Sequence, residues 1–283
     1  MVTVRAPLRV DLTGGWTDLV PFTNDFGGEV VNFTINKYVT AHSDGAGQVS
    51  FSFDVPAGSG LGTSGALNVA KIAALQGIEA MSTDELAEAA YQAENAAGNR
   101  CGRQDQWAAT HGGFNRFLFI ADSVERLPFE PAPSARKWLK KHLLIAHSGI
   151  SHKSGDIQNR VWSRYDEGDA QVIEGLKAIR LSSRTMVDAL QRDQRQLVVE
   201  ALNEVCRGVD LIDPSIHDPF RSVIDPLLSS GMVMAWKALG AGAGGCAALL
   251  CNPMHVSSVR SDIERLGWEI IDWDFEEEGV AIC

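Results

Sequence analysis

The sequence predicts an α+β protein built in two parts, and three observations support this fold class. Strand patterns dominate the first forty residues, where apolar and β-branched residues alternate with polar ones. Ala- and Leu-rich helical patterns follow a glycine-rich loop at residues 55–66. Three prolines at residues 128–133 interrupt both kinds of pattern. We place a domain boundary there, which divides the chain into residues 1–133 and residues 134–283.

The first part is expected to supply strands and then helices. Ser82 and the acidic residues after it match the start of a helix, because a hydroxyl cap and acidic first-turn side chains stabilise helix N-termini. The expected strands cover residues 2–5, 8–12, 29–40, 48–55 and 114–120. The expected helices cover residues 65–76, 83–97 and 104–110.

The second part is expected to be mostly helical, with a few strands. After a strand at residues 142–147, the expected helices are 154–180, 182–191, 194–208, 219–230 and 255–266. Residues 231–251 are apolar, but their glycines and Lys237 favour two buried strands around a glycine loop over a membrane-spanning helix. Near the last strand, the acidic run 272–278 is expected to form a solvated turn.

Charge and cysteine content argue against several functional classes. The formal net charge is -11 and the isoelectric point is near 5.1. This argues against nonspecific nucleic-acid binding, because no excess of cations is available to displace counterions. The five cysteines show no CxxC spacing, so neither a disulfide framework nor a zinc site is indicated. With no apolar signal segment at the N-terminus, we expect a reducing, cytoplasmic location.

The glycine-rich loop at residues 55–66 is the most informative segment. It reads Val-Pro-Ala-Gly-Ser-Gly-Leu-Gly-Thr-Ser-Gly-Ala and leads directly into a helical pattern. Backbone amides of such a loop, together with the positive end of the following helix, form a cradle for phosphate groups. An ordinary glycine turn with a hydroxyl cap is the alternative, but the density of glycines favours the cradle. The loop lacks both the Gly-Lys-Ser/Thr of a P-loop and the third glycine of a Rossmann fingerprint.

Three further segments carry polar or glycine-rich motifs. Residues 6–18 place Gly-Gly-Trp-Thr-Asp just beyond a strand, a position that suits substrate recognition. Residues 101–107 set the carboxylate of Asp105 beside the cation of Arg103. On its own, Asp105 is equally well explained as an acid that caps a helix. Residues 236–246 form a second glycine-rich loop.

With these motifs in this order, the chain resembles the GHMP kinases, the family of galactokinase, homoserine kinase and mevalonate kinase. The Gly-Gly-Trp-Thr-Asp segment is similar to the signature of the fucokinase and heptose 7-phosphate kinase branch, as are residues 26–32 and 148–152. The resemblance covers nearly the whole chain. It implies an N-terminal domain of the ribosomal protein S5 domain 2-like type, with a mixed sheet and helices on one side. It also implies a ferredoxin-like C-terminal domain, with ATP in the cleft between the two.

The resemblance implies ATP and Mg²⁺ as cofactors and assigns residues to them. Asp105 matches the family's catalytic aspartate, and Arg9 matches a nearby basic residue that favours the charged form of that aspartate. Ser64 and Glu94 match the hydroxyl and the acid that bind the metal; without the resemblance, Glu94 would be interpreted as a solvated helical residue. The residues expected to wrap the ATP phosphates are Pro56, Gly58, Ser59, Gly60, Leu61, Gly62, Thr63, Ser64, Gly65 and Ala66.

The same resemblance implies a substrate side. Thr17 and Asp18 match positions that bind sugar hydroxyls, whereas Gly15 stands where galactokinases carry an acid and so argues against galactose. Trp16 is expected either to stack on a sugar face or to plug the core. His152 is expected either to meet a substrate phosphate or to lie at an exposed helix start. Further substrate-side candidates in the matching segments are Gly28, Arg103 and Gly242.

The implied activity is ATP- and Mg²⁺-dependent phosphorylation of a hydroxyl on a sugar or sugar phosphate, with a heptose 7-phosphate-like or fucose-like acceptor. Two alternatives remain: a kinase of a cyclitol, aminosugar or other small alcohol, and a catalytically silent binding protein on the same fold. The expected partners are ATP and a sugar-like molecule, with no nucleic acid and no membrane; a homodimer is left open. One departure from the family is the short segment 39–54, which leaves the adenine pocket undefined.

Overall fold

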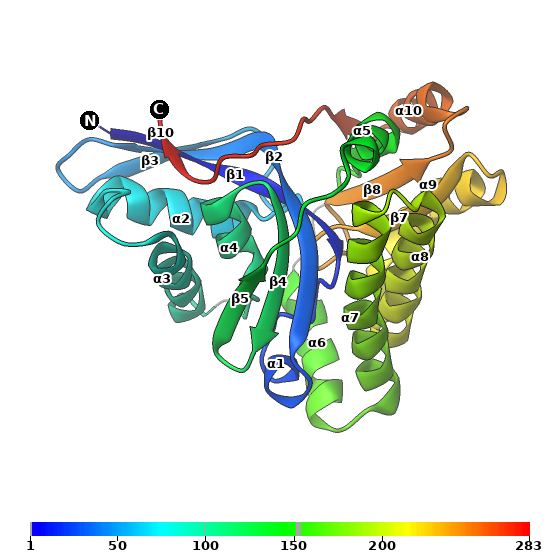
Figure 1. The fold of residues 1–283 in the computed structure, drawn as a ribbon, viewed down its shortest axis with the longest axis horizontal. Coiled ribbons are helices and arrows are strands. Elements are labelled where there is room, and N and C mark those ends of the chain that lie inside the picture. The colour runs from blue at the N-terminus through cyan, green and yellow to red at the C-terminus, as the bar shows by residue number, and fades with distance from the viewer. Residues whose placement is uncertain (1, 99, 151–153) are drawn as a thin grey trace.

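In the computed structural model, which describes residues 2–98, 100–150 and 154–283, the chain forms two β-sheets surrounded by helices (Figure 1). The strands of the first sheet are β1 (Val2–Thr13), β2 (Gly28–Ser43), β3 (Val49–Phe53), β4 (Phe114–Ile120), β5 (Ser123–Leu127) and β10 (Ala281–Ile282). Their order is β10-β1-β2-β4-β5, and β3 also pairs with β2. The first sheet is therefore built almost entirely from the N-terminal part, with its edge strand β10 supplied by the C-terminus.

The first sheet differs from the prediction in two ways. Residues 2–5 and 8–12 were expected as separate strands, but they form one strand with a register shift between Pro7 and Leu8. A bulge at this point accommodates the missing amide of proline. A mixed sheet was implied, but all the pairings described are antiparallel. The reason is that β1–β2, β2–β3 and β4–β5 follow one another in the chain and pair as direct neighbours.

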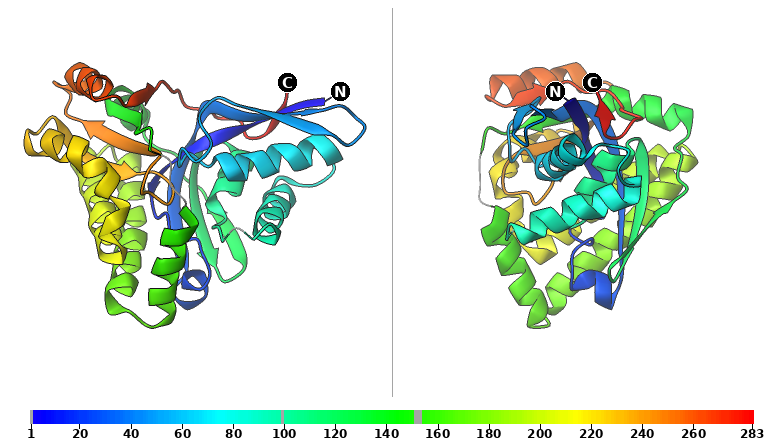
Figure 2. Two further views of the ribbon diagram at one scale, coloured as in Figure 1. Left: turned by 180° about the vertical axis from the view of Figure 1, so that it is seen from behind. Right: turned by 90° about the vertical axis from the view of Figure 1, so that its left-hand side faces the viewer.

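Three helices cover one face of the first sheet (Figures 1 and 2). They are α2 (Thr63–Gln76), α3 (Thr83–Ala96) and α4 (Gln104–His111), and a short helix α1 (Phe22–Asp25) precedes β2. Helix α2 buries small side chains against β1 and β2, because alanine and glycine allow its backbone to lie close to the sheet. Helix α3 begins with a capping box formed by Ser82 and Glu85. These three helices lie where the sequence predicted them, within two residues at each end.

The second sheet has the ferredoxin-like topology that was predicted. Its strands are β6 (Leu143–His147), β7 (Val233–Ala238), β8 (Cys246–Cys251) and β9 (Glu269–Ile271). They are antiparallel in the order β7-β8-β6-β9, which places the first strand between the third and the fourth. The helices of this part are α5 (Pro133–His142), α6 (Ser154–Asp166), α7 (Ala170–Gln191), α8 (Arg195–Ile212), the 3-10 helix η1 (Pro214–Ile216), α9 (Asp218–Ser229) and α10 (Val256–Arg265).

Several helix boundaries in the second part differ from the prediction. One helix was expected over residues 154–180, but α6 ends and α7 begins within that range. Gly168 has a φ of +79° and ends α6, and the Asp169 side chain caps α7 by accepting hydrogen bonds from two amides of its first turn. The expected break at residue 181 is absent because α7 continues through it. Helix α5 was not predicted, although Pro133 at its start is favourable there.

The two sheets share one hydrophobic core. Helices α7 and α8 lie beside the second sheet (Figure 1) and also contact β1. Leu8 and Phe33 of the first sheet belong to the same buried cluster as Met186, Leu202 and Leu250 of the second part. The two parts of the chain are therefore packed on a common hydrophobic core. Within the part of the chain that the structure describes, no helix is both long and apolar enough to cross a membrane.

The C-terminal tail crosses from the second sheet back to the first (Figure 1). Trp273 and Phe275 lie with their rings 5.3 and 5.1 Å from that of Phe33, and the Glu276 amide donates to the Thr34 carbonyl. Strand β10 then pairs with β1. The prediction of a solvated turn over the acidic run is wrong, because the aromatic residues between the acids pack this segment on the first sheet.

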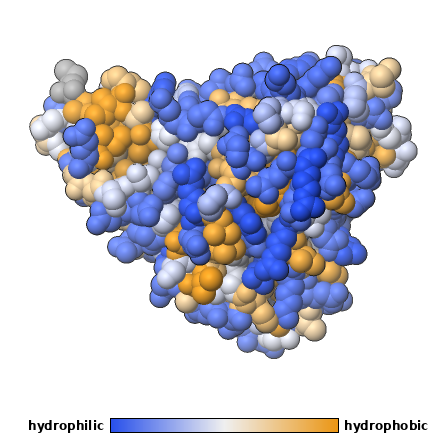
Figure 3. All heavy atoms as spheres, in the orientation of Figure 1, coloured by the Kyte–Doolittle hydropathy of each residue, from blue (hydrophilic) through white to orange (hydrophobic). Residues whose placement is uncertain are grey.

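Exposed apolar side chains gather at the end of the first sheet beside the N-terminus (Figure 3). The strands at this end expose Val2 by 40% and Ile282 by 60%. Hydrophilic atoms cover much of the rest of this face (Figure 3). Such a surface is expected of a chain with a formal net charge of -11.

Candidate active site

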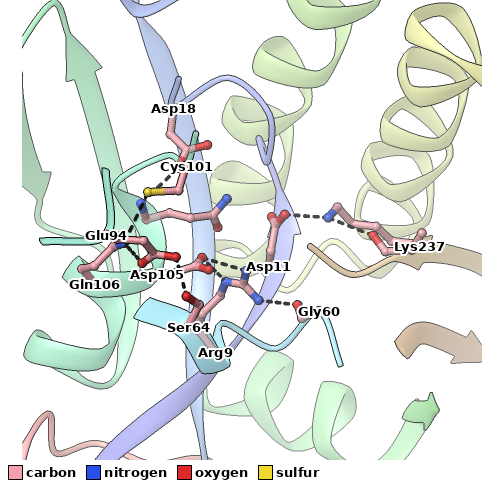
Figure 4. A network of polar contacts seen from close by, with 12 residues as sticks. Arg9, Asp11, Asp18, Gly60, Ser64, Glu94, Cys101, Asp105, Gln106 and Lys237 are labelled. Atoms are coloured by element: carbon pink, nitrogen blue, oxygen red, sulfur yellow. Dashed lines mark hydrogen bonds and ion pairs between the residues drawn. The ribbon is translucent and has the colours of Figure 1, made fainter. Parts of the chain in front are cut away.

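A cleft of about 390 Å³ opens between the two parts of the chain. The first part contributes the glycine-rich loop and the start of α2, and the second part contributes residues of α6 and of the loop after β7. A smaller pocket shares Arg9 and Asp105 with this cleft and extends to Asp18. Figure 4 shows the polar side chains of this region. Lining residues of the larger cleft include Arg9, Gly60, Ser64, Glu94, Asp105 and Gly240.

The glycine-rich loop bends around the N-terminus of α2. Gly60 and Gly62 both have a φ of +79°, which glycine adopts without strain. A Cβ on Gly60 would overlap the Leu239 carbonyl, and the Cys246 amide donates to the Ser59 carbonyl at 2.8 Å. The second glycine-rich loop therefore packs directly against the first. Because the first amides of a helix have no acceptor within the helix, the start of α2 is a site for anions.

Arg9 and Asp105 form an ion pair where the two pockets meet (Figure 4). Arg9 lies on β1, and Asp105 lies in the first turn of α4. Nη2 and Nε of Arg9 lie 2.7 and 2.8 Å from Oδ1 of Asp105. Nη1 of Arg9 donates to the Gly60 carbonyl at 2.6 Å. The Arg9 side chain is 4% exposed and that of Asp105 is 27% exposed, so the carboxylate keeps access to the cleft.

Glu94 of α3 lies beside the start of α2 (Figure 4). Its Oε1 accepts a hydrogen bond from Ser64 Oγ at 2.5 Å, and its Oε2 accepts from Gln106 at 2.7 Å and from Asn68 at 3.4 Å. Burial raises the pKa of this carboxyl, and the three hydrogen bonds oppose that effect. The described contacts of Glu94 include no lysine or arginine. No cluster of three or more His, Cys, Asp or Glu suited to a metal occurs among the described residues.

Asp18 lies in the smaller pocket, where it is 2% exposed. Its Oδ2 accepts a hydrogen bond from the Gln104 amide at 3.0 Å, and a Cβ on Gly102 would overlap its carboxylate. Burial is the main cause that raises the pKa of Asp18 to about 7, and the carboxylates of Asp105 and Asp11 add to it. The pocket thus holds a carboxyl that changes charge near neutral pH.

The rest of the Gly-Gly-Trp-Thr-Asp segment shapes this pocket. Trp16 lines the pocket with a φ of +80°, and its ring lies 6.5 Å from that of Trp162. Thr17 is fully buried, and its hydroxyl donates to the Gly14 carbonyl at 2.7 Å, so it supports the turn. Gly28 lies behind the turn, where a Cβ would overlap the Thr17 carbonyl.

Some predicted site residues are not brought to the cleft lining. Arg103 pairs with a carboxylate of α3 at 3.1 Å, and Gly242 packs against η1. Leu61 is fully buried in the core, and Pro56 is exposed at the start of the loop. His152 lies outside the described residues. Buried residues that support the loop from behind are Ser59, Gly65 and Ala66.

Sequence reasoning missed several residues of this region. Asn68 lies one helical turn after Ser64, and Gln106 directly follows Asp105, so spacing along the chain was a usable signal for both. The buried Lys237 had no such signal, because its carboxylate partner lies 226 residues earlier in the chain.

The sequence is similar to those of known kinases. Residues 29–113 match the family model of the GHMP kinases N terminal domain. The chain is 26% identical over 339 residues to the D-glycero-alpha-D-manno-heptose 7-phosphate kinase of Campylobacter jejuni, which covers 99% of this chain and 98% of that protein. It is 24% identical over 347 residues to the bifunctional fucokinase/GDP-fucose pyrophosphorylase of Arabidopsis thaliana, with 99% of this chain but 32% of that protein covered.

The fold has a similar counterpart among solved structures. The crystal structure of a D-glycero-D-manno-heptose 1-phosphate kinase from Bacteroides thetaiotaomicron has a TM-score of 0.78 and 20% identity, and the match covers 100% of this chain and 99% of the other. This likeness shows that the two chains share the two-part α+β fold. The domain match shows that residues 29–113 form a GHMP kinases N-terminal domain, and along its whole length the chain is similar to small-molecule kinases.

Proposed function

We propose that the chain transfers the γ-phosphoryl group of ATP to a hydroxyl of a sugar or sugar phosphate. One observation carries the proposal: the Arg9–Asp105 pair lies where the glycine-rich loop at residues 55–66, proposed here as the phosphate-binding loop, meets the smaller pocket that contains Asp18, here the Asp18 pocket. A donor phosphate in the cleft and an acceptor hydroxyl in the pocket would come together at Asp105. Phosphoryl transfer depends mainly on positioning and charge stabilisation, which this arrangement supplies.

On the donor side, the start of α2 and the glycine-rich loop would bind the phosphates through backbone amides. Glycine at positions 60 and 62 lets the backbone approach the ligand closely. The Gly60 carbonyl is held by Arg9 at 2.6 Å, so this oxygen is not free to repel phosphate oxygens. The loop would therefore present mainly positive groups to the donor.

The Ser64–Glu94 pair fits a Mg²⁺ ion. Glu94 is a buried carboxyl whose described contacts include no cation, and the Ser64 hydroxyl adds a neutral oxygen 2.5 Å away. One or two side-chain oxygens, completed by phosphates and water, are the usual protein environment of Mg²⁺ in kinases. When bound, the ion would neutralise charge on the donor phosphates. We therefore assign Ser64 and Glu94 to the metal.

On the acceptor side, Asp105 would take the hydroxyl proton or orient the hydroxyl toward the donor. Ionised Asp18 would accept hydrogen bonds from neighbouring hydroxyls, and Trp16 would offer an apolar face to the ring. The relatives named for heptose 7-phosphate and fucose support a heptose 7-phosphate-like or fucose-like acceptor. The pocket's carboxylates recognise hydroxyls in general, so a cyclitol or aminosugar is the second acceptor class.

The domain limits and the location of the protein are part of the same proposal. We place the boundary between residues 133 and 134, where α5 begins. All five cysteines are free thiols, as expected for a protein that works in the reducing cytoplasm.

Release of ADP from ATP in the presence of Mg²⁺ tests the proposed function. The acceptor panel contains heptoses, heptose phosphates, fucose, cyclitols and aminosugars, and a reaction without acceptor is the control. The proposal expects release that depends on a sugar or sugar phosphate. Release with cyclitols or aminosugars alone would change the acceptor class. No release with any acceptor, together with no ATP binding, would contradict the proposal.

A further inference from the structure

A buried ion pair joins the two parts of the chain beside the Arg9–Asp105 pair (Figure 4). Nζ of Lys237, on β7, lies 2.6 Å from Oδ2 of Asp11, on β1. The side chains of Lys237 and Asp11 are 5% and 0% exposed. The other carboxylate oxygen of Asp11 has no hydrogen-bond partner among the described residues. Two charges are thus held in the interior with incomplete hydrogen bonding.

Stability alone does not account for this pair. The free energy needed to remove two charges from water is about as large as the free energy gained from their attraction. A protein with two apolar side chains of similar volume in place of such a pair is often at least as stable. The unpartnered oxygen of Asp11 adds to the cost. A Cβ on Gly15 would overlap the Asp11 carboxylate, so the neighbouring turn leaves room for the charge. These features point to a role in the site.

The pair closes a ring of contacts around the phosphate-binding loop. Asp11 lies two residues after Arg9 on β1, and alternate residues of a strand share one face. Arg9 in turn donates to the Gly60 carbonyl at 2.6 Å. Gly60 is in close contact with Gly240, which follows Lys237 by three residues. The ring therefore runs from β1 through both glycine-rich loops to β7 and returns through the ion pair.

We propose that Lys237 and Asp11 are positioning residues that hold the second glycine-rich loop against the phosphate-binding loop and so fix the place of the donor phosphates. The inference rests on the proposed kinase function and extends it to two residues that lie outside the cleft lining. Without the pair, β7 and its loop are free to shift relative to β1. Donor binding and turnover then fall, whereas acceptor binding in the Asp18 pocket changes little.

Three variants test this role. Lys237→Met breaks the pair and leaves a buried charge, whereas Asp11→Asn combined with Lys237→Met removes both charges. Arg184→Met is the matched control, because Arg184 of α7 also ties the second part to the first, through Glu29 at 3.2 Å, but lies outside the ring. For each variant we would measure the urea midpoint, ATP affinity by calorimetry without acceptor, kcat, and KM for the acceptor.

The expected results separate positioning from stability. The double variant regains most of the urea midpoint lost in Lys237→Met, yet binds ATP about tenfold more weakly and turns over about tenfold more slowly. Its acceptor KM is unchanged above about pH 8, where Asp18 is ionised with or without the neighbouring Asp11 charge. Arg184→Met, whose side chain is 58% exposed and whose partner Glu29 keeps Arg116, changes the midpoint little and keeps ATP affinity and kcat. A double variant with wild-type ATP affinity and kcat would overturn the proposal.

Two further outcomes are covered by the same design. If neither Lys237→Met nor the double variant folds, Lys237→Arg, which retains the cation but differs in shape, is measured with the same readouts and the same expectation for ATP affinity. If the wild-type protein binds ATP but phosphorylates no acceptor, the proposed function fails, while the comparison of ATP affinities still tests the ion pair.

Discussion

Arg9 contacts both Asp105 and the glycine-rich loop at residues 55–66. Its Nε and Nη2 lie 2.8 and 2.7 Å from Oδ1 of Asp105, and its Nη1 donates to the Gly60 carbonyl at 2.6 Å. One planar guanidinium therefore sets the spacing between the group proposed to meet the acceptor and the loop proposed to bind the donor. Because the Arg9 side chain is 4% exposed, solvent does not compete for these contacts.

Replacing Arg9 with Lys should keep the charge and lose the shared contact. A lysine ammonium cannot reproduce the fork that reaches Asp105 and Gly60 together. We expect kcat to fall about tenfold to a hundredfold, which is the effect of losing the free energy of one or two charge-assisted hydrogen bonds in the transition state. We also expect KM for ATP to rise. Steady-state kinetics measures both. Unchanged values would show that this contact does not align the reacting groups.

Replacing Glu94 with Gln should weaken the response to magnesium, because one ligand of the proposed metal loses its charge. We expect the Mg²⁺ concentration for half-maximal activity to rise about tenfold or more, with little change in KM for the acceptor. Glu88→Gln is the matched control, since Glu88 lies on the same helix but contacts Arg103 and Trp107. Identical Mg²⁺ titrations of wild type and Glu94→Gln would exclude Glu94 as a ligand.

Acceptor use should depend on the ionisation of Asp18. Burial raises its pKa from 3.8 to about 7, and only the ionised form accepts hydrogen bonds with both oxygens. We expect kcat/KM for the acceptor to rise about tenfold per pH unit below pH 7 and to level off above about pH 8. Asp18→Asn should be less active and insensitive to pH in this range. A flat wild-type profile between about pH 5.5 and 8 would be incompatible with this role.

Local signals explain how much of the site could be predicted from the sequence. The glycine spacing and the hydroxyls of Thr63 and Ser64 mark the loop and the start of α2, because both features depend on neighbouring residues. Arg9, Glu94 and Asp105 are far apart in the chain, so only the family resemblance suggested that they meet. The structure brings these three side chains to one cleft.

The C-terminal tail is expected to contribute to stability through Trp273. This side chain is 6% exposed, packs on Phe33 and Phe275, and donates from Nε1 to the Leu143 carbonyl at 3.3 Å. Trp273→Ala should lower the free energy of unfolding by about 3–5 kcal/mol, because it leaves a cavity between the tail and the first sheet. Urea unfolding measures the loss. Asp272→Asn, at an exposed ion pair, serves as the control and should change it by less than about 1 kcal/mol.

The parts of the fold that were missed fall into two groups. The break between α6 and α7 had a local signal, since Gly168 and Asp169 form a helix stop followed by a helix cap. The return of the tail to the first sheet and the Lys237–Asp11 pair had none. Both depend on contacts between residues more than two hundred positions apart, and neither composition nor periodicity encodes such contacts.

The most direct test of the proposed reaction follows the labelled γ-phosphoryl group of ATP into the acceptor, in wild type and in Asp105→Asn. We expect wild type to label the sugar or sugar phosphate, and the variant to do so about 10²–10⁴ times more slowly. ATP affinity should change far less than the rate, because an Asn side-chain oxygen can still accept a hydrogen bond from Arg9, whereas the urea midpoint should fall because the buried Arg9 loses its counter-charge. Label transfer by Asp105→Asn at the wild-type rate would contradict the account.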